Sequence, residues 1–262
     1  MTDYVSAERR GPHLRLLLNR PERRNAITVA MYAALADAIT AAQDDPDLRV
    51  ITLEGEGVDF TGGNDLADFM KEMPQPGADT DIPVWRLLRA LATNQVPLIA
   101  AVHGNAVGIG TTMLFHCDLV VAEEGTKFRM PFTELGLVPE AASSLILPRL
   151  AGRQLAAKYL LLGEPFGVEE AERFGLVTHR AASGALAERL EEVLALLLSR
   201  PPEALRLTQR LLRGTSHDEV LERMDRENGH FSERLTSSEV RDAIQAFFLK
   251  RDRQRHTPAS SA

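Results

Sequence analysis

The sequence contains a single cysteine, Cys117, among its 262 residues, so no disulfide can form within the chain. It has no apolar run of the roughly 18 to 20 residues needed to cross a bilayer, and its first residues lack the pattern of a secretory signal. Positive charge is also scarce, because 30 Lys and Arg residues stand against 37 Asp and Glu residues, for a formal net charge of -7. These absences predict a cytoplasmic protein that does not enter a membrane and whose main partner is not a nucleic acid.

Two kinds of hydrophobic pattern divide the chain. The first 150 or so residues contain short apolar runs whose length favours buried strands, at Leu14–Leu18, Val50–Leu53, Pro97–Val102 and Leu119–Ala122. Segments with helical spacing lie between these runs, which predicts an α/β fold. After about residue 150 we expect helices alone, at Gln154–Leu162, Val168–Phe174, Leu186–Leu198, Pro202–Leu212, Asp218–Leu235 and Ser238–Phe248.

A glycine-rich turn in the segment 97–117 is the first candidate site. An apolar strand leads to Gly108, Ile109 and Gly110, and a segment with helical spacing follows. Glycines at a strand-to-helix turn let backbone N–H groups approach a ligand closely, at the positive end of the helix dipole. Such a turn can bind a phosphate, stabilise an oxyanion or be a plain tight turn. It is not a dinucleotide-binding fingerprint, because Met113 stands where the third glycine would be.

A second glycine turn follows the strand that ends at Leu53. Its residues are, in order, Phe60, Thr61, Gly62, Gly63, Asn64, Asp65 and Leu66. Two turns that each offer one backbone N–H can form a two-donor oxyanion hole, in which one donor typically contributes about 2.7–4 kcal/mol of transition-state stabilisation. Asp65 is suited to capping the helix that follows, so we expect it to be structural rather than catalytic.

The two turns together resemble the crotonase (enoyl-CoA hydratase/isomerase) superfamily, and the resemblance extends over nearly the whole chain. The other matching segments are Leu18-Asn19-Arg20-Pro21, Asn25-Ala26, Cys117-Asp118, Gly163, Gly175-Leu176-Val177 and Ala246-Phe247-Phe248-Leu249-Lys250-Arg251. The resemblance implies an α/β fold of spiralled ββα units with a helical C-terminal region. It places the spiral core and acyl-CoA site in residues 1–200, and a helical region that builds homotrimers or hexamers in residues 201–262.

The same resemblance implies the ligand and the residues that hold it. The substrate is an acyl-CoA thioester, so CoA belongs to the substrate and no separate cofactor is expected. The two oxyanion donors are the backbone N–H groups of Asn64 and Ile109. The positions that match substrate or CoA binding are Arg24, Gly62, Asn64, Gly108, Ile109, Gly110, Phe132, Phe247 and Lys250. For Arg24 and Lys250, the alternative is an ordinary solvated surface charge.

The reaction is indicated by the acidic residues at the matched positions. Hydratases of this family use two glutamates to activate water, but Thr112 and Phe132 occupy those positions here, so efficient hydration is not expected. Glu140 follows Pro139, where hydratases have glycine, and this local sequence resembles the Δ3,Δ2-enoyl-CoA isomerases. One carboxylate can remove a proton from C2 and return it to C4 while the oxyanion hole holds the dienolate.

Other assignments stay open from the sequence. Glu134 is the nearest rival base, and Glu140 has a surface carboxylate or helix cap as its alternative role. We expect His103 and His116 to be structural, and the spacing of His, Cys and acidic residues predicts no metal site. The alternative functions are an enoyl-CoA hydratase or other crotonase-type lyase or hydrolase, and a non-catalytic binding or assembly protein. The last would touch RNA through the basic residues in 250–255.

Overall fold

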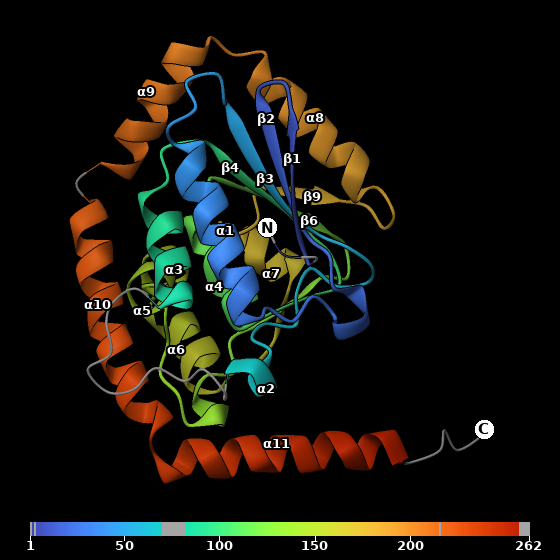
Figure 1. Cartoon of the computed structure of the whole chain (residues 1–262), viewed down its shortest axis with the longest axis vertical. Helices are drawn as coiled ribbons and strands as arrows, with labels where there is room; N and C mark the ends of the chain where they lie inside the picture. Colours follow the sequence, from blue (N-terminus) through green and yellow to red (C-terminus); the bar gives the residue numbers. More distant parts are fainter. Residues whose placement is uncertain (1, 3, 70–81, 215, 257–262) are drawn as a thin grey trace.

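The residues that the structure describes form two β-sheets, which are the framework of the fold (Figure 1). The structure, a computed structural model, describes residues 2, 4–69, 82–214 and 216–256. The strands are β1 (Val5–Arg10), β2 (His13–Leu18), β3 (Val50–Gly55), β4 (Leu98–Val102), β5 (Asn105–Val107), β6 (Leu119–Glu123), β7 (Lys127–Arg129), β8 (Phe166–Gly167) and β9 (His179–Ala181). Within the described residues, the large sheet has the order β1-β2-β3-β4-β6-β9 and the small sheet the order β5-β7-β8. All neighbours pair in parallel except β1 with β2 and β7 with β8.

Helices cover both faces of the large sheet and make up the C-terminal end of the chain (Figure 1). The α-helices are α1 (Val29–Ala42), α2 (Leu66–Phe69), α3 (Pro83–Thr93), α4 (Ile109–Thr112), α5 (Ser143–Ala151), α6 (Arg153–Leu161), α7 (Val168–Arg173), α8 (Leu186–Leu198), α9 (Pro202–Arg213), α10 (Ser216–Leu235) and α11 (Ser238–His256). In the described part of the chain, the short 3-10 helices are η1 (Pro21–Arg23), η2 (Met113–His116) and η3 (Thr133–Leu135).

The central strands are buried on both faces. In β4, Leu98, Ala100 and Val102 point into the main core, which α1 and α3 close, whereas Ile99 and Ala101 pack with α8 on the other face. Side chains of a strand alternate between the two faces, so a strand covered on both sides needs apolar residues at every position. This burial explains the unbroken apolar run that predicts β4.

The main elements follow the sequence patterns that predict them, with one correction. The four apolar runs form β2, β3, β4 and β6. The expectation of helices alone after residue 150 is wrong, because β8 and β9 lie there. β8 pairs with β7 and β9 with β6. Strands of two or three residues are too short to show a period, and pairing with longer-range partners stabilises them.

The helices α9, α10 and α11 wrap around the outside of the sheets (Figure 1). α10 packs on α3, where the rings of Phe231 and Trp85 meet edge to face at 5.7 Å. α11 runs past η3 and continues beyond the body of the molecule, at the lower edge of the view. None of the helices in the described part of the chain is both long enough and apolar enough to span a membrane.

Candidate functional site

The Gly108 turn leads from β5 directly into α4. Gly108 has φ +57° and ψ -120°, a conformation that residues with a side chain rarely adopt. Its N–H donates to the carbonyl of Arg129 at 2.8 Å, and its carbonyl accepts from the N–H groups of Thr111 and Thr112. The turn therefore makes Ile109 the first residue of α4 and places its N–H at the start of that helix.

The Gly63 turn lies directly against this segment. Thr61 forms a β-bridge with Ala106, and a Cβ atom added to Gly63 would lie 2.6 Å from the carbonyl oxygen of Val107. Since that distance is too short for any side chain, the close approach of the two turns requires glycine here. The sequence predicted two adjoining glycine turns, and the structure brings them into contact.

The N–H of Asn64 faces away from the strand-like segment at Ile27. In the bridge between these two residues, the N–H of Ile27 donates to the carbonyl of Gly63 at 2.8 Å and the N–H of Asp65 donates to Ile27 at 2.9 Å. Successive peptide groups of an extended chain point to opposite sides, so the N–H of Asn64 points to the other side. The N–H of Asn64 is therefore not used in the bridge to Ile27, as an oxyanion donor requires.

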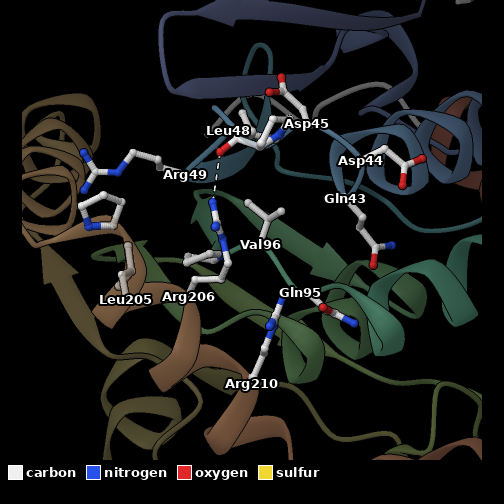
Figure 2. A pocket seen from close by; sticks show the side chains of 13 residues that line it. Gln43, Asp44, Asp45, Leu48, Arg49, Gln95, Val96, Leu205, Arg206 and Arg210 are labelled. Carbon is white, nitrogen blue, oxygen red and sulfur yellow. Dashed lines mark hydrogen bonds between the residues drawn. The ribbon is translucent and has the colours of Figure 1, made fainter.

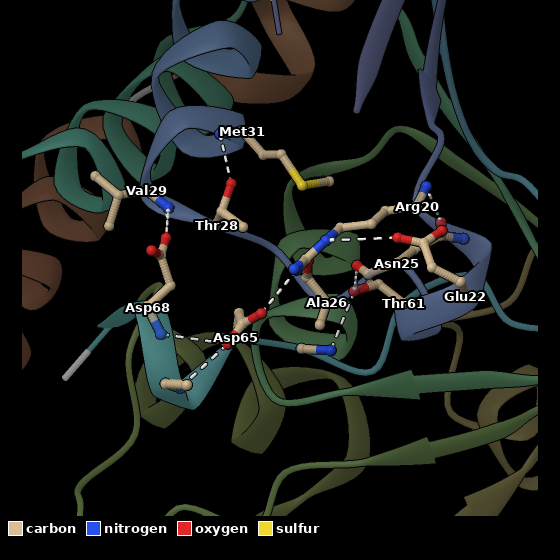
Figure 3. A network of polar contacts seen from close by, with 12 residues as sticks. Arg20, Glu22, Asn25, Ala26, Thr28, Val29, Met31, Thr61, Asp65 and Asp68 are labelled. Atoms are coloured by element: carbon tan, nitrogen blue, oxygen red, sulfur yellow. Dashed lines mark hydrogen bonds and ion pairs between the residues drawn. The ribbon is translucent and has the colours of Figure 1, made fainter. Parts of the chain in front are cut away.

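A polar network holds the Asn64 turn in place (Figure 3). Arg20 donates through Nη1 to Asp65 Oδ2 at 2.7 Å and to the carbonyl of Ala26 at 3.0 Å. Asp65 in turn accepts from the N–H groups of Ala67 and Asp68 through Oδ1, at 3.1 and 3.2 Å. Burial raises the pKa of Asp65, but the hydrogen bonds from Arg20 and the backbone more than offset this, so the pKa lies below its usual value. Asp65 is the structural helix cap that the sequence predicts.

Tyr32 of α1 contacts the same turn. Its hydroxyl group donates a hydrogen bond to Oδ1 of Asn64, and its side chain is 1% exposed. Burial raises the pKa of Tyr32 well above its usual value, and the negative charge of Glu140 adds to this effect. Tyr32 is thus a neutral donor that fixes the Asn64 side chain. The sequence pattern alone does not single out Tyr32, although a tyrosine on the buried face of a helix usually needs a hydrogen-bond partner.

Glu140 is a buried carboxyl group at the junction of several elements. It is 4% exposed, and its Oε1 accepts a hydrogen bond from the hydroxyl group of Thr112, the last residue of α4. Burial raises the pKa of Glu140 to about 8, the Thr112 bond lowers it, and the charge of Glu227 raises it. Glu140 is therefore neither a surface carboxylate nor a helix cap through its side chain. Its partner Thr112 lies about one helical turn after Ile109 in α4. A carboxyl group with a pKa near neutrality suits a group that both accepts and returns a proton.

The neighbouring candidates have other partners. Glu134 is about half exposed and pairs with Arg129 at 2.5 Å, which weakens the case for it as the rival base. His103 donates through Nε2 to the carbonyl of Gly57 at 2.9 Å. His116 donates in the same way to Ala141, and burial lowers its pKa to about 4. Both histidines thus have the backbone partners of structural residues.

The residues matched to CoA binding are placed as follows. Arg24 has a side chain that is 73% exposed, with Nε 3.6 Å from Asp59 Oδ2, and its carbonyl accepts from the N–H of Gly62 at 2.7 Å. It therefore lies beside the Gly63 turn. Phe132 is 6% exposed and belongs to the main core. The backbones of Phe247 and Lys250 lie in α11, but their side chains are outside the described part of the structure, like those of the basic residues 251–255.

A separate cavity of about 240 Å³ lies between α9 and the loops that precede β3 and β4. Arg206 and Arg210 reach into it, and Arg206 donates to the carbonyl of Pro46 at 3.0 Å (Figure 2). The cavity is at the starting ends of these strands, whereas the Gly63 and Gly108 turns follow their far ends. It is not part of the candidate site. Among the described residues, no group of three or more His, Cys, Asp and Glu side chains is arranged to hold a metal ion.

Two glycine turns in contact, beside a buried carboxyl group on a spiral of two sheets, define the crotonase fold, and comparison with known proteins gives the family. The enoyl-CoA hydratase/isomerase family model matches residues 14–256, so the chain belongs to that family. A crystal structure of an enoyl-CoA hydratase/isomerase from Pseudoalteromonas atlantica matches with a TM-score of 0.88 at 38% identity, covering 95% of this chain and 98% of that one.

Two relatives from Escherichia coli (strain K12) differ in their reactions. The 1,2-epoxyphenylacetyl-CoA isomerase is 31% identical over 258 residues, covering 97% of this chain and 98% of the relative. The 2,3-dehydroadipyl-CoA hydratase is 31% identical over 239 residues, covering 91% and 92%. The chain is a crotonase-type acyl-CoA enzyme. Since one relative is an isomerase and the other a hydratase, its reaction has to be argued from its own residues.

Proposed function

We propose that this enzyme is a Δ3,Δ2-enoyl-CoA isomerase and that Glu140 is its catalytic acid and base. The carboxylate of Glu140 removes a proton from C2 of a 3-enoyl thioester, and the electrons move through C3 to form a dienolate. The N–H groups of Asn64 and Ile109 hold the dienolate oxygen. Glu140 then returns the proton to C4, which leaves the double bond between C2 and C3. One side chain thus carries the proton from C2 to C4, and the reaction needs no resident cofactor or metal.

The buried carboxyl group of Glu140 is the observation that carries this proposal. Oε1 of Glu140 accepts a hydrogen bond from Thr112 of α4, the helix that begins with Ile109. When Glu140 is ionised, its charge raises the pKa of Tyr32, whose hydroxyl group donates a hydrogen bond to the side chain of Asn64. Glu140 is thus linked to both glycine turns. A single group with a raised pKa is a stronger base when ionised and a usable acid when protonated, which suits movement of one proton between two carbons.

Hydration is the less favoured reaction at this site. Activating a water molecule in the usual mechanism takes two carboxyl groups, and the two matched positions hold Thr112 and Phe132. Thr112 donates its hydrogen bond to Glu140, and Phe132 is part of the apolar core. Neither side chain can exchange a proton with water as a glutamate does.

The remaining expectations for the complex follow from the same proposal. We propose that CoA lies along the exposed side chain of Arg24, whose backbone contacts Gly62, with Phe247 and Lys250 of α11 as further contacts. We also propose a homotrimer or hexamer that uses the C-terminal helices. Exposed leucines on α9 support this, since Leu207, Leu211 and Leu212 are 48%, 80% and 74% exposed.

The test compares two substrates and one variant. The purified enzyme and its Glu140→Gln variant are incubated with trans-3-hexenoyl-CoA and with crotonyl-CoA, and double-bond migration and water addition are followed. We expect isomerisation by the native enzyme, a loss of at least about 100-fold in the variant, and negligible hydration. The variant should still bind CoA, because Gln has the shape of Glu. Full isomerase activity in Glu140→Gln, or rapid hydration of crotonyl-CoA by the native enzyme, would refute the proposal.

A further inference from the structure

Glu227 of α10 contacts the turn that follows Glu140. Its Oε2 accepts a hydrogen bond from the N–H of Ala142 at 2.6 Å, and its Oε1 accepts one from the N–H of Ser144 at 3.0 Å. The residue is 6% exposed. A buried carboxylate is costly unless hydrogen bonds satisfy its oxygens, and here each oxygen has a backbone donor at the start of α5. The abundance of charged residues in α10 hides this role in the sequence.

The backbone that Glu227 holds is strained. Ala141 and Ala142 have φ values of +60° and +55°, in the left-handed region that is unfavourable for a residue with a side chain. The carbonyl of Ala141 accepts from His116 at 2.9 Å, and the N–H of Ala142 donates to Glu227. Strain of this kind persists only where the surroundings enforce it, and it occurs at functional sites. Since the two alanines directly follow Glu140, the contacts that hold them also place Glu140.

Several titratable groups face Glu140 or the turn behind it. Tyr32 of α1 has a pKa raised well above its usual value by burial, and His116 of η2 has a pKa lowered to about 4 by burial, so both are neutral near pH 7. Burial also raises the pKa of Glu227, while its backbone donors and the charge of Arg223 on the same helix oppose this. The negative charge of Glu227 raises the pKa of Glu140.

We propose that Glu227 is a positioning residue for the reaction, which fixes the turn behind Glu140 and sets a negative charge near its carboxyl group. The inference rests on the proposed function, because it assigns Glu227 a part in the proton transfer by Glu140. It has two separable consequences. The geometric one acts on kcat, since a displaced base reacts slowly with substrate that still binds. The electrostatic one acts on the pH at which Glu140 loses its proton.

Three variants separate these consequences. Glu227→Gln removes the charge and one acceptor, so we expect kcat to fall about 10-fold with little change in KM. We also expect the rising limb of its pH–rate profile to move down by about one pH unit. Glu227→Asp keeps the charge, but its shorter side chain moves the carboxylate away from the turn. We therefore expect kcat to fall while the rising limb of the pH–rate profile stays at the native pH. Glu222→Gln is the control, because Glu222 is an exposed residue of α10 paired with Arg226. Glu222→Gln should match the native enzyme in kcat and in the position of the rising limb of the pH–rate profile.

Thermal unfolding provides a readout that needs no substrate. The difference in stability between the native enzyme and Glu140→Gln, measured across pH, reports the ionisation of Glu140. In the Glu227→Gln background we expect this transition to occur about one pH unit lower. An unchanged transition, with an unchanged kcat in both Glu227 variants, would overturn the inference. A shifted transition in a protein whose isomerase activity survives Glu140→Gln would instead refute the proposed function, while the electrostatic interaction between Glu227 and Glu140 would stand.

Discussion

The hydroxyl group of Thr112 donates a hydrogen bond to Oε1 of Glu140, which joins the end of α4 to the loop that precedes α5. The family resemblance places the first glutamate of the hydratases at this position in α4. In this enzyme the residue is a neutral donor that acts on the carboxyl group of a different segment. In the proposed mechanism the site therefore combines the two glycine turns with one proton-transfer group instead of a pair, and the hydrogen bond from Thr112 lowers the pKa of that group.

Removal of the Thr112 hydroxyl group should change the pH dependence of the reaction. The bond from Thr112 lowers the pKa of Glu140, so Thr112→Val should raise that pKa further above about 8. A hydrogen bond to a charged group contributes about 1.5–3 kcal/mol, which corresponds to a shift of at least about one pH unit. Because the base must be ionised, the isomerase rate at pH 7 should fall about 10-fold. Thr112→Ser keeps the donor and should retain the native pH–rate profile, and identical profiles for both variants would contradict this role.

Stability should depend on pH through Glu140. The folded-state pKa of about 8 lies above the usual value of 4.5, so its contribution to stability is fully present below about pH 4.5 and is lost as the pH rises through 8. Glu140→Gln cannot ionise and should not lose stability in this way. Since each pKa unit corresponds to about 1.4 kcal/mol, the Tm of the variant should exceed that of the native enzyme by at least about 5 °C at pH 9.

A neighbouring glutamate controls for general effects of the substitution. Glu134→Gln removes a half-exposed carboxyl group that pairs with Arg129. Its Tm should follow the native enzyme across the same pH range in thermal unfolding experiments. If Glu140→Gln also followed the native enzyme from pH 4.5 to 9, Glu140 would not be a carboxyl group with a raised pKa.

The sequence predicts those parts of the fold and site that depend on local patterns. Buried strands such as β4 can be recognised in the sequence as apolar runs, because both of their faces require apolar residues. The glycines at positions 63 and 108 mark backbone conformations that other residues rarely adopt. Glu140 was indicated by the resemblance at its position after Pro139. The structure adds that it is buried, which the sequence alone does not settle.

The features that the sequence does not predict depend on contacts between distant segments. Glu227 is one of many acidic residues in an amphipathic helix, and only folding brings it to the turn behind Glu140. Ala141 and Ala142 adopt left-handed conformations without the glycine that usually signals them. The strand β8 has two residues, and its existence depends on pairing with β7. In each case tertiary contacts override the local preference of the residues.

Exposed leucines on α9 provide a test of assembly. Leu211 is 80% exposed, and burial in an interface would remove this apolar surface from water. We expect sedimentation analysis of the native enzyme to give the mass of a trimer or hexamer of the 28.9 kDa chain. Leu211→Glu should shift the distribution towards smaller species, whereas Leu211→Met should leave it unchanged. A native enzyme that sediments as a monomer would refute the proposed assembly.

Two glycines with nearly equal φ angles allow the effect of backbone strain to be separated from the effect of a close contact. Gly63 and Gly125 have φ values of +87° and +88°, so an alanine at either position costs roughly 1–2 kcal/mol of backbone strain. At Gly125 the new Cβ would meet no atom within 4 Å, whereas at Gly63 it would lie 2.6 Å from the carbonyl oxygen of Val107. Gly125→Ala should therefore lower the Tm by a few degrees and leave the isomerase activity unchanged.

Gly63→Ala should have a larger and different effect. To admit the methyl group, the chain must move Val107 away, and Val107 directly precedes the turn that places the N–H of Ile109. If the two turns together hold the substrate oxygen, this displacement costs one donor, and kcat/KM should fall by about 100-fold or more in protein that remains folded by circular dichroism. Equal activities for Gly63→Ala and Gly125→Ala would mean that the contact between the turns serves only the fold. The oxyanion would then have to be held by other groups.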